Sequence, residues 1–140
     1  MANVRAKVFE YTAGLDREGR ISSEGGAPLE LDESWTPEHV LLAALLRCSL
    51  ASLTYYAKPA GLEVSASGTA HGTVTLREDE GVFGLVSAAV HLDVELTPPP
   101  EPDDARKLVH RAQAGCFVSN SLAVHPTYHW RVNGADVEPA

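Results

Sequence analysis

The sequence predicts an α+β fold in which antiparallel strands pack on one long, buried helix. Three observations support this prediction. The segment 38–58 consists mostly of apolar residues, Ala and Leu above all, and contains no glycine or proline. The segments 63–77 and 83–97 alternate apolar and polar side chains, as β-strands do. A chain of 140 residues has the size of one domain, so we expect residues 1–140 to form a single unit.

The composition is that of a globular protein and argues against a nucleic-acid-binding surface. Hydrophobic residues make up 44% of the chain and charged residues 21%, which is ordinary for such a protein. The net charge is −8 and no run of Lys and Arg occurs, whereas phosphate binding needs clustered cations. Residues 1–7 lack the apolar core of a signal peptide, and Arg47 and two serines interrupt the apolar segment. We therefore expect a cytoplasmic protein that binds neither membranes nor nucleic acid.

The first part of the chain predicts short strands joined by glycine-containing turns. Residues 4–11 alternate small or branched apolar residues with larger ones, which favours a strand. Residues 12–19 form a loop that carries Arg17 and is punctuated by glycine. We expect two further short strands, over residues 21–23 and 29–32, on either side of a Glu-Gly-Gly turn.

The long helix has clear start and stop signals. Thr36 suits the N-cap, proline follows at the first helical position, and Glu38 complements the positive end of the helix dipole. Pro59 and Gly61 end it. A helix that is apolar on nearly every side is expected to have other elements packed all round it. At ~1.5 Å per residue it would be roughly 33 Å long, more than one small domain needs to cross its core.

The second half of the chain predicts a hairpin, a second helix and a final strand. In the strand 63–77, small apolar residues share one face, so a bulky element such as the long helix can approach closely. The strand 83–97 returns to complete the hairpin, and its polar face is expected to be solvated. A proline-rich connector at 98–102 precedes a helix over 103–114, and alternation at 128–132 predicts the last strand.

The two cysteines are the candidate reactive groups. Cys48 lies in the middle of the long helix and Cys116 follows the second helix. A permanent disulfide is not expected in the cytoplasm, so these residues are either inert buried thiols or a reactive pair. Pairing would require Cα atoms about 4.4–6.8 Å apart, which only the fold can provide. Both interpretations stay open, because buried cysteines commonly serve as small hydrophobic residues.

A reactive Cys48 needs a cation, because an ordinary thiol with a pKa of ~8.5 is only about 3% thiolate at pH 7. Arg47 points about 100° away around the helix, whereas Arg17 and Arg20 lie on a loop, where functional side chains are often held. Glu38 stands ten positions before Cys48, about 15 Å along a straight helix. It can serve the thiol only if the helix breaks or if it comes from a second copy. None of these residues needs a catalytic role. Arg17 and Arg20 would then be solvent-exposed charges on a loop, and Glu38 would only stabilise the first turn of the helix.

No other catalytic or metal-binding pattern is present in the sequence. The six histidines show no metal-ligand spacing, and His125 and His129, four apart, fall near a predicted strand. Gly-rich phosphate loops and Ser/His/Asp signatures are absent. We therefore expect neither a metal nor a bound cofactor.

Three stretches of the chain combine these candidate residues in a specific order. Thr-Pro-Glu at 36–38 precedes the apolar run and Cys48, which stands ten positions after the glutamate. The second cysteine begins Cys-Phe-Val-Ser-Asn at 116–120, and the N-terminal loop reads Arg-Glu-Gly-Arg-Ile-Ser-Ser-Glu-Gly at 17–25. In these motifs the chain resembles the OsmC/Ohr family, the osmotically inducible protein C and organic hydroperoxide resistance proteins. The resemblance spans nearly the whole chain.

The resemblance implies a thiol-dependent peroxidase that reduces organic hydroperoxides to alcohols. Cys48 would be the peroxidatic thiolate, which attacks the distal peroxide oxygen and becomes a sulfenic acid. Cys116 would resolve it to an intramolecular disulfide. Arg17 would lower the pKa of the Cys48 thiol and orient the peroxide, with Glu38 holding Arg17 in place. The apolar residues around Cys48 suit an organic peroxide.

The resemblance also implies an OsmC-like fold and an intertwined homodimer with sites at the subunit interface. An external dithiol, lipoyl-type or thioredoxin-like, would recycle the enzyme. Two residues depart from the family pattern: Phe117 stands where proline is frequent, and Arg47 replaces a small or neutral residue. Either can change the geometry of the cysteine pair or the environment of the thiolate. Because the N-terminal motif is short, Arg20 is the alternative to Arg17.

A second function of a different class is a non-catalytic OsmC-like domain. Such a domain would bind a small apolar ligand or sense oxidation through its two thiols. The two functions differ in turnover, since an enzyme cycles with excess dithiol whereas a sensor is oxidised once. A third interpretation makes both cysteines core residues and predicts that Cys→Ser changes alter only stability.

Overall fold

In the computed structural model, which describes residues 7–139, the chain divides into two units, Met1–Thr36 and Pro37–Ala140. Each unit has its own secondary structure. That the two units form a single domain over residues 1–140 stays a prediction.

The first unit contains a short antiparallel hairpin, in which β1 (Ala13–Leu15) pairs with β2 (Ile21–Ser23). The Asp16 carboxylate holds the turn, because it accepts hydrogen bonds from the backbone N–H groups of Glu18 at 3.0 Å and Arg20 at 2.9 Å. Gly19 completes the turn with a φ of 83°, which a residue with a Cβ rarely adopts. The strand predicted over 21–23 is confirmed, and β1 was missed.

The strand predicted over residues 4–11 is wrong for the part that can be described. Residues 4–6 lie outside the described residues, and residues 7–11 are irregular and exposed. Alternation is not enough to form a strand when no neighbouring strand supplies the ladder of hydrogen bonds. For the same reason the predicted strand 29–32 is reduced to one isolated bridge between Leu29 and Ile21.

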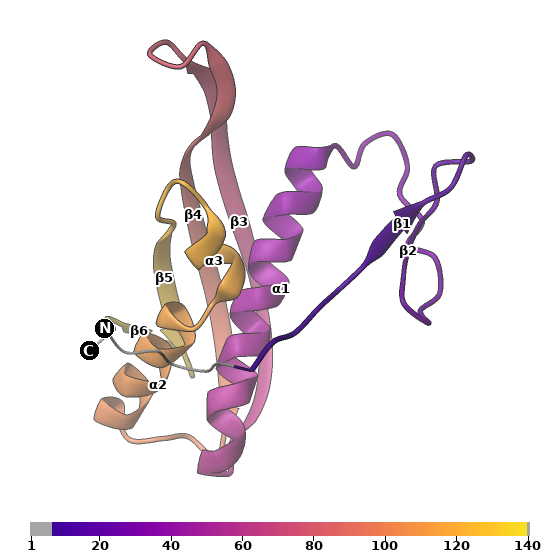
Figure 1. Ribbon diagram of the computed structural model, residues 1–140. Helices are drawn as coiled ribbons and strands as arrows, with labels where there is room; N and C mark the ends of the chain where they lie inside the picture. Colours follow the sequence, from indigo (N-terminus) through magenta and orange to yellow (C-terminus); the bar gives the residue numbers. More distant parts are fainter. Residues whose placement is uncertain (1–6, 140) are drawn as a thin grey trace. The chain divides into compact units, whose positions relative to one another are not determined.

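The second unit begins with the long helix α1 (Pro37–Ala57), which passes into the short 3-10 helix η1 (Lys58–Ala60) and ends at Gly61 with a φ of 75°. The elements that follow are β3 (Glu63–Arg77), β4 (Val82–Thr97), α2 (Pro102–Ala114), α3 (Phe117–Ser121), β5 (Thr127–Val132) and β6 (Ala135–Val137). The predicted bounds of α1, β3, β4, α2 and β5 agree with these within a few residues, whereas α3 and β6 were missed. Figure 1 shows the β3–β4 hairpin projecting beyond the other elements of this unit.

The strands of the second unit form one sheet in the order β3-β4-β5-β6. The β3–β4 pair is antiparallel, as predicted, and β5–β6 is antiparallel too, but β4 and β5 are parallel, so the expectation of a purely antiparallel sheet is wrong. A parallel pair requires a crossover connection, and the segment containing α2 and α3 supplies it. The sheet is therefore mixed, which the strand patterns could not reveal because they carry no information on direction.

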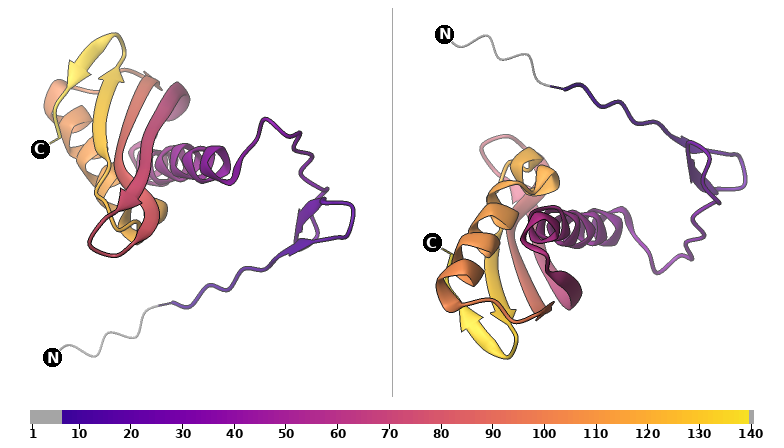
Figure 2. Two further views of the ribbon diagram at one scale, coloured as in Figure 1. Left: turned by 90° about the horizontal axis from the view of Figure 1, so that it is seen from above. Right: turned by 90° about the horizontal axis from the view of Figure 1, so that it is seen from below.

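The helices cover one face of this sheet and leave the other face to solvent. Alternate residues of β4 and β5 are buried beneath α1 and α2, namely Val90, Leu92, Val94, Leu96, Trp130 and Val132. The residues between them are exposed, so the predicted solvated face is confirmed. Figure 2 shows both helices on the same side of the strands. The Ser52 hydroxyl donates to the Ala112 carbonyl oxygen at 2.7 Å and joins α1 to α2.

Within the chain, α1 buries a single stripe of its surface. Its buried residues are Leu45, Ser49, Ser52, Leu53 and Ala57. Only 28% of its most apolar stretch is buried, and Tyr55 is 72% exposed. By length and composition alone, Pro37–Ala60 meets the description of a membrane span, as core helices of soluble proteins also do. Within the chain, the expectation of elements packed all round α1 is thus met on one side only.

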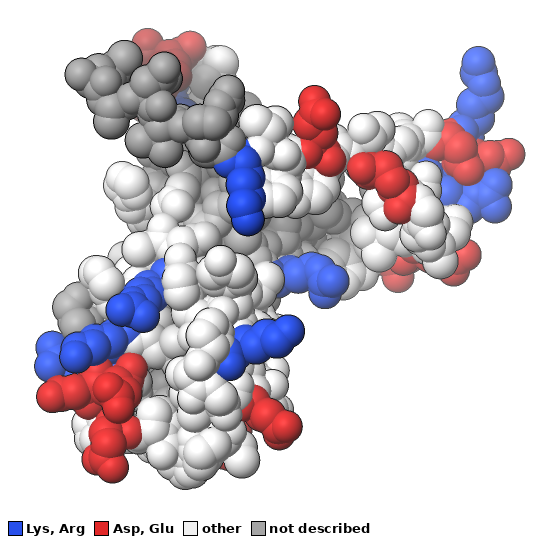
Figure 3. Space-filling view, turned by 60° about the horizontal axis from the view of Figure 1, so that its bottom comes forward, with Lys and Arg blue, Asp and Glu red and all other residues white. Residues whose placement is uncertain are grey.

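The described part of the surface includes stretches without charged side chains on the face drawn in Figure 3. The charged side chains on this face stand in small groups, with uncharged surface between them. Exposed apolar side chains also lie near the tip of the β3–β4 hairpin, where Val82 and Phe83 are 49% and 76% exposed. The second unit therefore presents apolar surface both on α1 and on the hairpin.

The glycines of β3 allow the close packing that the sequence predicted. A Cβ at Gly72 would lie 3.1 Å from a methyl group of Leu42 on α1 and 2.9 Å from one of Leu85. A Cβ at Gly68 would instead collide with the backbone carbonyl oxygen of His91, which cannot move as a side chain can.

We expect Gly68→Ala to lower the free energy of unfolding by about 1–3 kcal/mol, because the backbone of β4 must shift. The matched variant Gly72→Ala should lose less, because its neighbours are the flexible ends of leucine side chains. Urea denaturation of the two variants beside the wild type measures the difference. Equal stability of all three proteins would contradict the backbone collision at Gly68.

Candidate active site

The two cysteines meet where α1 packs against the segment that begins α3. Cys48 is partly exposed in the middle of α1, and Cys116 is fully buried at the residue before α3. Both are free thiols. The backbone N–H of Val118 donates to the Cys48 sulfur at 3.5 Å, which ties the start of α3 to α1. The fold thus brings together two residues that are 68 positions apart in the sequence.

The buried thiol of Cys116 belongs to a small network of hydroxyl groups. The Ser49 Oγ lies 3.6 Å from the Cys116 Sγ and 2.8 Å from the Tyr128 hydroxyl oxygen. The Ser49 hydroxyl also donates to the Leu45 carbonyl oxygen at 2.8 Å. Ser49 is fully buried, and Tyr128 stacks on Trp130 with ring centroids 5.6 Å apart. The network therefore joins α1 directly to β5 through the Ser49 and Tyr128 hydroxyls, with the Cys116 sulfur against Ser49.

The surroundings shift the pKa values of the two thiols in opposite directions. Burial, together with the neighbouring Cys116, raises the pKa of Cys48, and the backbone N–H of Val118 only partly opposes this. Burial also acts to raise the pKa of Cys116, but hydrogen bonds from the Ser119 amide, the Ser49 and Tyr128 hydroxyls and the Cys48 thiol outweigh it and lower the pKa. Hydrogen bonds to the charged form thus decide the direction for Cys116. None of the principal influences on Cys48 is a cation.

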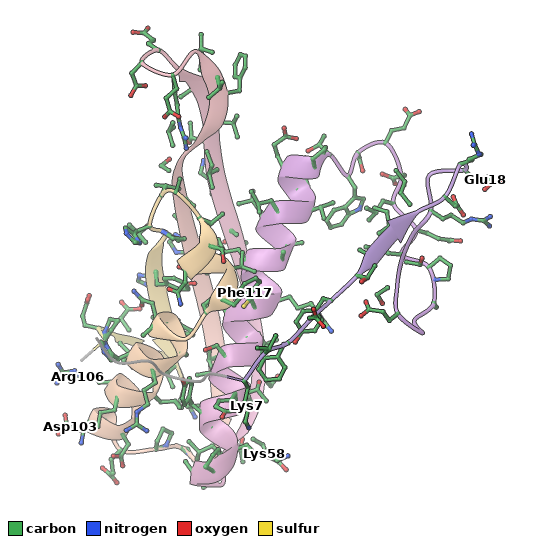
Figure 4. The ribbon with its side chains drawn as sticks, in the orientation of Figure 1. Lys7, Glu18, Lys58, Asp103, Arg106 and Phe117 are labelled. Carbon is green, nitrogen blue, oxygen red and sulfur yellow. The ribbon has the colours of Figure 1, made fainter. Side chains whose placement is uncertain are left out.

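Phe117 contributes a backbone donor that proline at this position would lack. It begins α3 beside α1, as Figure 4 shows, and its side chain is 71% exposed. Its backbone N–H acts on Cys48 and lowers the pKa of that thiol. Because proline has no N–H, the departure from the family pattern adds a hydrogen-bond donor near Cys48.

The predicted catalytic arginine belongs to the first unit. Arg20 forms an ion pair with Asp16, Nε to Oδ2, at 2.9 Å and approaches the Glu18 carboxylate at 3.4 Å. Within residues 7–139, no such ion pair involves Arg17, so the carboxylates of its loop leave Arg17 available to another anion. This distinction favours Arg17 over Arg20. That Arg17 acts on Cys48 stays a prediction.

The remaining predicted residues lie on α1. The helix is continuous from Pro37 to Ala57, so Glu38 and Cys48 are separated by the full ten positions of a regular helix, about 15 Å. Arg47 is exposed and lines a groove of about 280 Å³ with Leu46, Leu50 and residues of β3. Of the two routes that the sequence left open for Glu38, a broken helix is therefore excluded. That Glu38 acts at the Cys48 thiol stays a prediction.

Ser49 and Tyr128 were not predicted from the sequence. Ser49 follows the cysteine on an apolar helix, and Tyr128 stood only as an apolar position of the last strand. Their closeness to Cys116 depends on contacts across the fold. Among residues 7–139, no group of three or more His, Cys, Asp and Glu side chains is arranged to hold a metal ion.

The family of the chain follows from its sequence. The family model described as OsmC-like protein matches residues 30–130, so the chain belongs to the OsmC-like protein family. No curated protein matches the chain. The α+β architecture is the OsmC-like fold, as the solved structures similar to it also indicate.

Three solved structures illustrate this similarity. An OsmC-like protein of unknown function from Vibrio cholerae has a TM-score of 0.72 at 16% identity, over 88% of this chain and 99% of that one. An organic hydroperoxide resistance protein from Elizabethkingia anophelis has a TM-score of 0.62 at 19% identity, over 91% and 98%. The organic hydroperoxide resistance protein OhrB of Bacillus subtilis has a TM-score of 0.53 at 20% identity, over 89% and 96%. At these identities the similarity establishes the fold.

We expect the Cys116 thiol, measured alone in the Cys48→Ser variant, to ionise at a lower pH than an ordinary thiol with a pKa of ~8.5. The physical reason is that the Ser119 amide and the hydroxyls of Ser49 and Tyr128 favour its charged form. Thiolate absorbance at 240 nm, followed against pH, measures the midpoint. The same protein unfolded in guanidinium chloride is the control, and a folded midpoint at or above the unfolded one would contradict the prediction.

Proposed function

We propose that this protein is a cysteine-based peroxidase that reduces organic hydroperoxides to alcohols. The observation that carries the proposal is the meeting of Cys48 and Cys116 at one junction, with one thiol partly exposed and the other buried. Membership of the OsmC-like family adds support, because similar structures include proteins named for organic hydroperoxide resistance. We place the activity in the cytoplasm, with neither a membrane nor a nucleic acid as partner.

The reaction divides between the two thiols. The Cys48 thiolate attacks the distal oxygen of the hydroperoxide, the O–O bond breaks, and the alkoxide takes up a proton to leave as the alcohol. Cys48 is then a sulfenic acid. The Cys116 sulfur attacks the Cys48 sulfur, hydroxide leaves and is protonated to water, and an intramolecular disulfide forms. An external dithiol, lipoyl-type or thioredoxin-like, supplies the two electrons that restore both thiols.

Activation of Cys48 requires a cation, because burial raises the pKa of this thiol. We propose that Arg17 supplies the charge and orients the peroxide, and that Glu38 holds Arg17 in place. An opposite charge within ~4–6 Å lowers a pKa by about 1–3 units and so increases the thiolate fraction of Cys48. The ion pairs of Arg20 with Asp16 and Glu18 support the choice of Arg17.

We propose that the site is completed in a homodimer, in which Glu38 of the partner subunit serves the Cys48 thiol. The unbroken α1 supports this, because Glu38 cannot reach Cys48 along its own helix. The apolar surface of α1 and the exposed tip of the hairpin support it further, since a second copy would remove both from water. The charge of Arg47 on the same helix disfavours a lipid environment there.

We expect the wild type to consume tert-butyl hydroperoxide continuously with dithiothreitol as the reductant. Cys48→Ser should lose all turnover above background, because it lacks the nucleophile. Cys116→Ser should still consume one equivalent of peroxide but form no intramolecular disulfide. Arg17→Met should lower the rate at least tenfold, whereas the matched variant Arg20→Met should retain it. Peroxide loss and non-reducing mass spectrometry provide the readouts.

The same assay separates the competing functions. If the wild type, with both thiols confirmed as reduced, consumes no peroxide, the peroxidase proposal is wrong and a ligand-binding domain is favoured. One equivalent consumed without cycling would favour an oxidation sensor. Unchanged behaviour of both Cys→Ser variants would make the cysteines core residues.

We also expect light scattering to give twice the mass of one 14.9 kDa chain. Leu41→Asp, which puts a charge on the exposed apolar surface of α1, should shift the protein towards the monomer. The control Thr69→Asp adds the same charge on the solvated face of β3 and should stay dimeric. A stable wild-type monomer would remove the route by which the partner's glutamate reaches the thiol.

A further inference from the structure

We propose that Ser49 and Tyr128 form a hydroxyl pair that holds the Cys116 thiolate, so that Cys116 is the leaving group when the disulfide is reduced. The external dithiol then attacks the Cys48 sulfur. This inference rests on the proposed disulfide cycle and deepens it by assigning the direction of its reductive half. The two hydroxyl groups have no role in the motifs that identified the cysteines.

In the reduced site each hydroxyl proton of Ser49 and Tyr128 has an acceptor. The Ser49 hydroxyl has one proton and two lone pairs, and it has three neighbours: the Leu45 carbonyl at 2.8 Å, the Tyr128 hydroxyl at 2.8 Å and the Cys116 sulfur at 3.6 Å. The carbonyl can only accept. When Cys116 is a thiol, Ser49 donates to Leu45 while Tyr128 and Cys116 donate to Ser49, and every group is satisfied.

The same groups can stabilise a thiolate with a small rearrangement. The Ser49 proton turns from the Leu45 carbonyl to the Cys116 sulfur. Leu45 is not left unpaired, because inside α1 its carbonyl also accepts the backbone N–H of Ser49. Tyr128 continues to donate to the Ser49 oxygen, which strengthens the hydrogen bond to sulfur. Burial raises the pKa of Tyr128 to about 12, so its phenol remains a donor at physiological pH.

Access and leaving-group quality both select Cys48 as the sulfur that is attacked. Cys48 is partly exposed whereas Cys116 is fully buried, so an incoming thiolate reaches Cys48 first. A departing thiolate is stabilised by hydrogen-bond donors that already lie against its sulfur, as the Ser49 hydroxyl does at Cys116. The hydroxyl groups lie against Cys116, and those of Ser49 and Tyr128 do not figure among the principal influences on Cys48. An arginine beside Cys48 would attract an incoming thiolate to the same sulfur.

Reduction of the disulfide proceeds by two thiol–disulfide exchanges. One thiolate of the external dithiol bonds to the Cys48 sulfur, the Cys48–Cys116 bond breaks, and Cys116 leaves with the electron pair as a thiolate held by Ser49. The second thiol of the reductant loses its proton to solvent. Its sulfur then attacks the first reductant sulfur, which is bonded to Cys48 in the mixed disulfide. Cys48 is released as a thiolate, and the reductant is oxidised to its disulfide by two electrons. Cys116 then takes up a proton from solvent and returns to the reduced network.

The test uses the wild-type protein oxidised with diamide, so that it does not depend on peroxidase activity. Excess 2-mercaptoethanol reacts with the disulfide for a short time, acid stops the exchange, free thiols are blocked, and peptide mapping locates the adduct. We expect mercaptoethanol on Cys48 and a blocked thiol at Cys116. An adduct on Cys116, or the failure of diamide to join the two cysteines, would overturn the proposal.

Two variants test the hydroxyl groups themselves. Tyr128→Phe and Ser49→Ala should each slow the reduction about fivefold, the effect of one hydrogen bond of about 1 kcal/mol. In the Cys48→Ser background, each should also raise the ionisation midpoint of Cys116, a readout that a merely structural role would not move. The matched control Tyr55→Phe, at an exposed tyrosine of α1, should change neither quantity.

The outcomes separate the two proposals. Unchanged reduction rates and an unchanged midpoint in both Tyr128→Phe and Ser49→Ala would overturn the assignment of the hydroxyl pair. A protein that fails the peroxide assay but gives the Cys48 adduct would lose the peroxidase proposal and retain the direction of exchange. A protein that consumes peroxide but gives the Cys116 adduct would retain the peroxidase proposal and lose the proposed direction of exchange.

Discussion

The packing of α1 against the start of α3 is the contact on which the candidate site depends. It places the Val118 N–H on the Cys48 sulfur and the Ser49 hydroxyl on the Cys116 sulfur. Three further contacts hold the surroundings in place: Ser52 bonds to α2, Trp130 bonds to Gln113, and Tyr128 stacks on Trp130. The helices and the sheet thus meet around a pair of sulfur atoms, and a shift of α1 would separate the two thiols.

The position of the thiols on α1 and α3 explains why they differ. Cys48 and Ser49 are consecutive in a helix and point about 100° apart, so one reaches the partly exposed flank while the other enters the core. Cys116 is reached by the buried hydroxyl, whereas Cys48 receives chiefly backbone N–H groups. Both thiols are desolvated. Hydrogen-bond donors outweigh this effect at Cys116, whereas at Cys48 the neighbouring Cys116 adds to it. This asymmetry would give a disulfide between them a preferred sense of reduction.

The single buried stripe of α1 connects the fold to the assembly that we propose. One side of the helix lies against β3, where Gly72 admits Leu42, and most of its apolar stretch is not buried within the protomer. The principal influences on the pKa of Cys48 include no cation, and the arginine that we propose for the site belongs to the first unit. A partner copy would bury the apolar surface of α1 and bring the Glu38 carboxylate that we propose holds Arg17, so the same assembly serves the hydrophobic and the electrostatic requirements.

The sequence by itself determined the long elements and the candidate nucleophiles. The hairpin of β3 and β4 was predicted nearly to its ends, because its alternation runs over 15 and 16 residues, and the start and stop residues of α1 act locally. Only the tertiary structure decided the parallel pairing of β4 with β5, the short elements β1, α3 and β6, and the irregular course of residues 7–11. Short elements depend on partners distant in the chain. For the same reason the roles of Ser49 and Tyr128 could not be predicted: their hydroxyls meet across a separation of 79 residues, and no local pattern records such a contact.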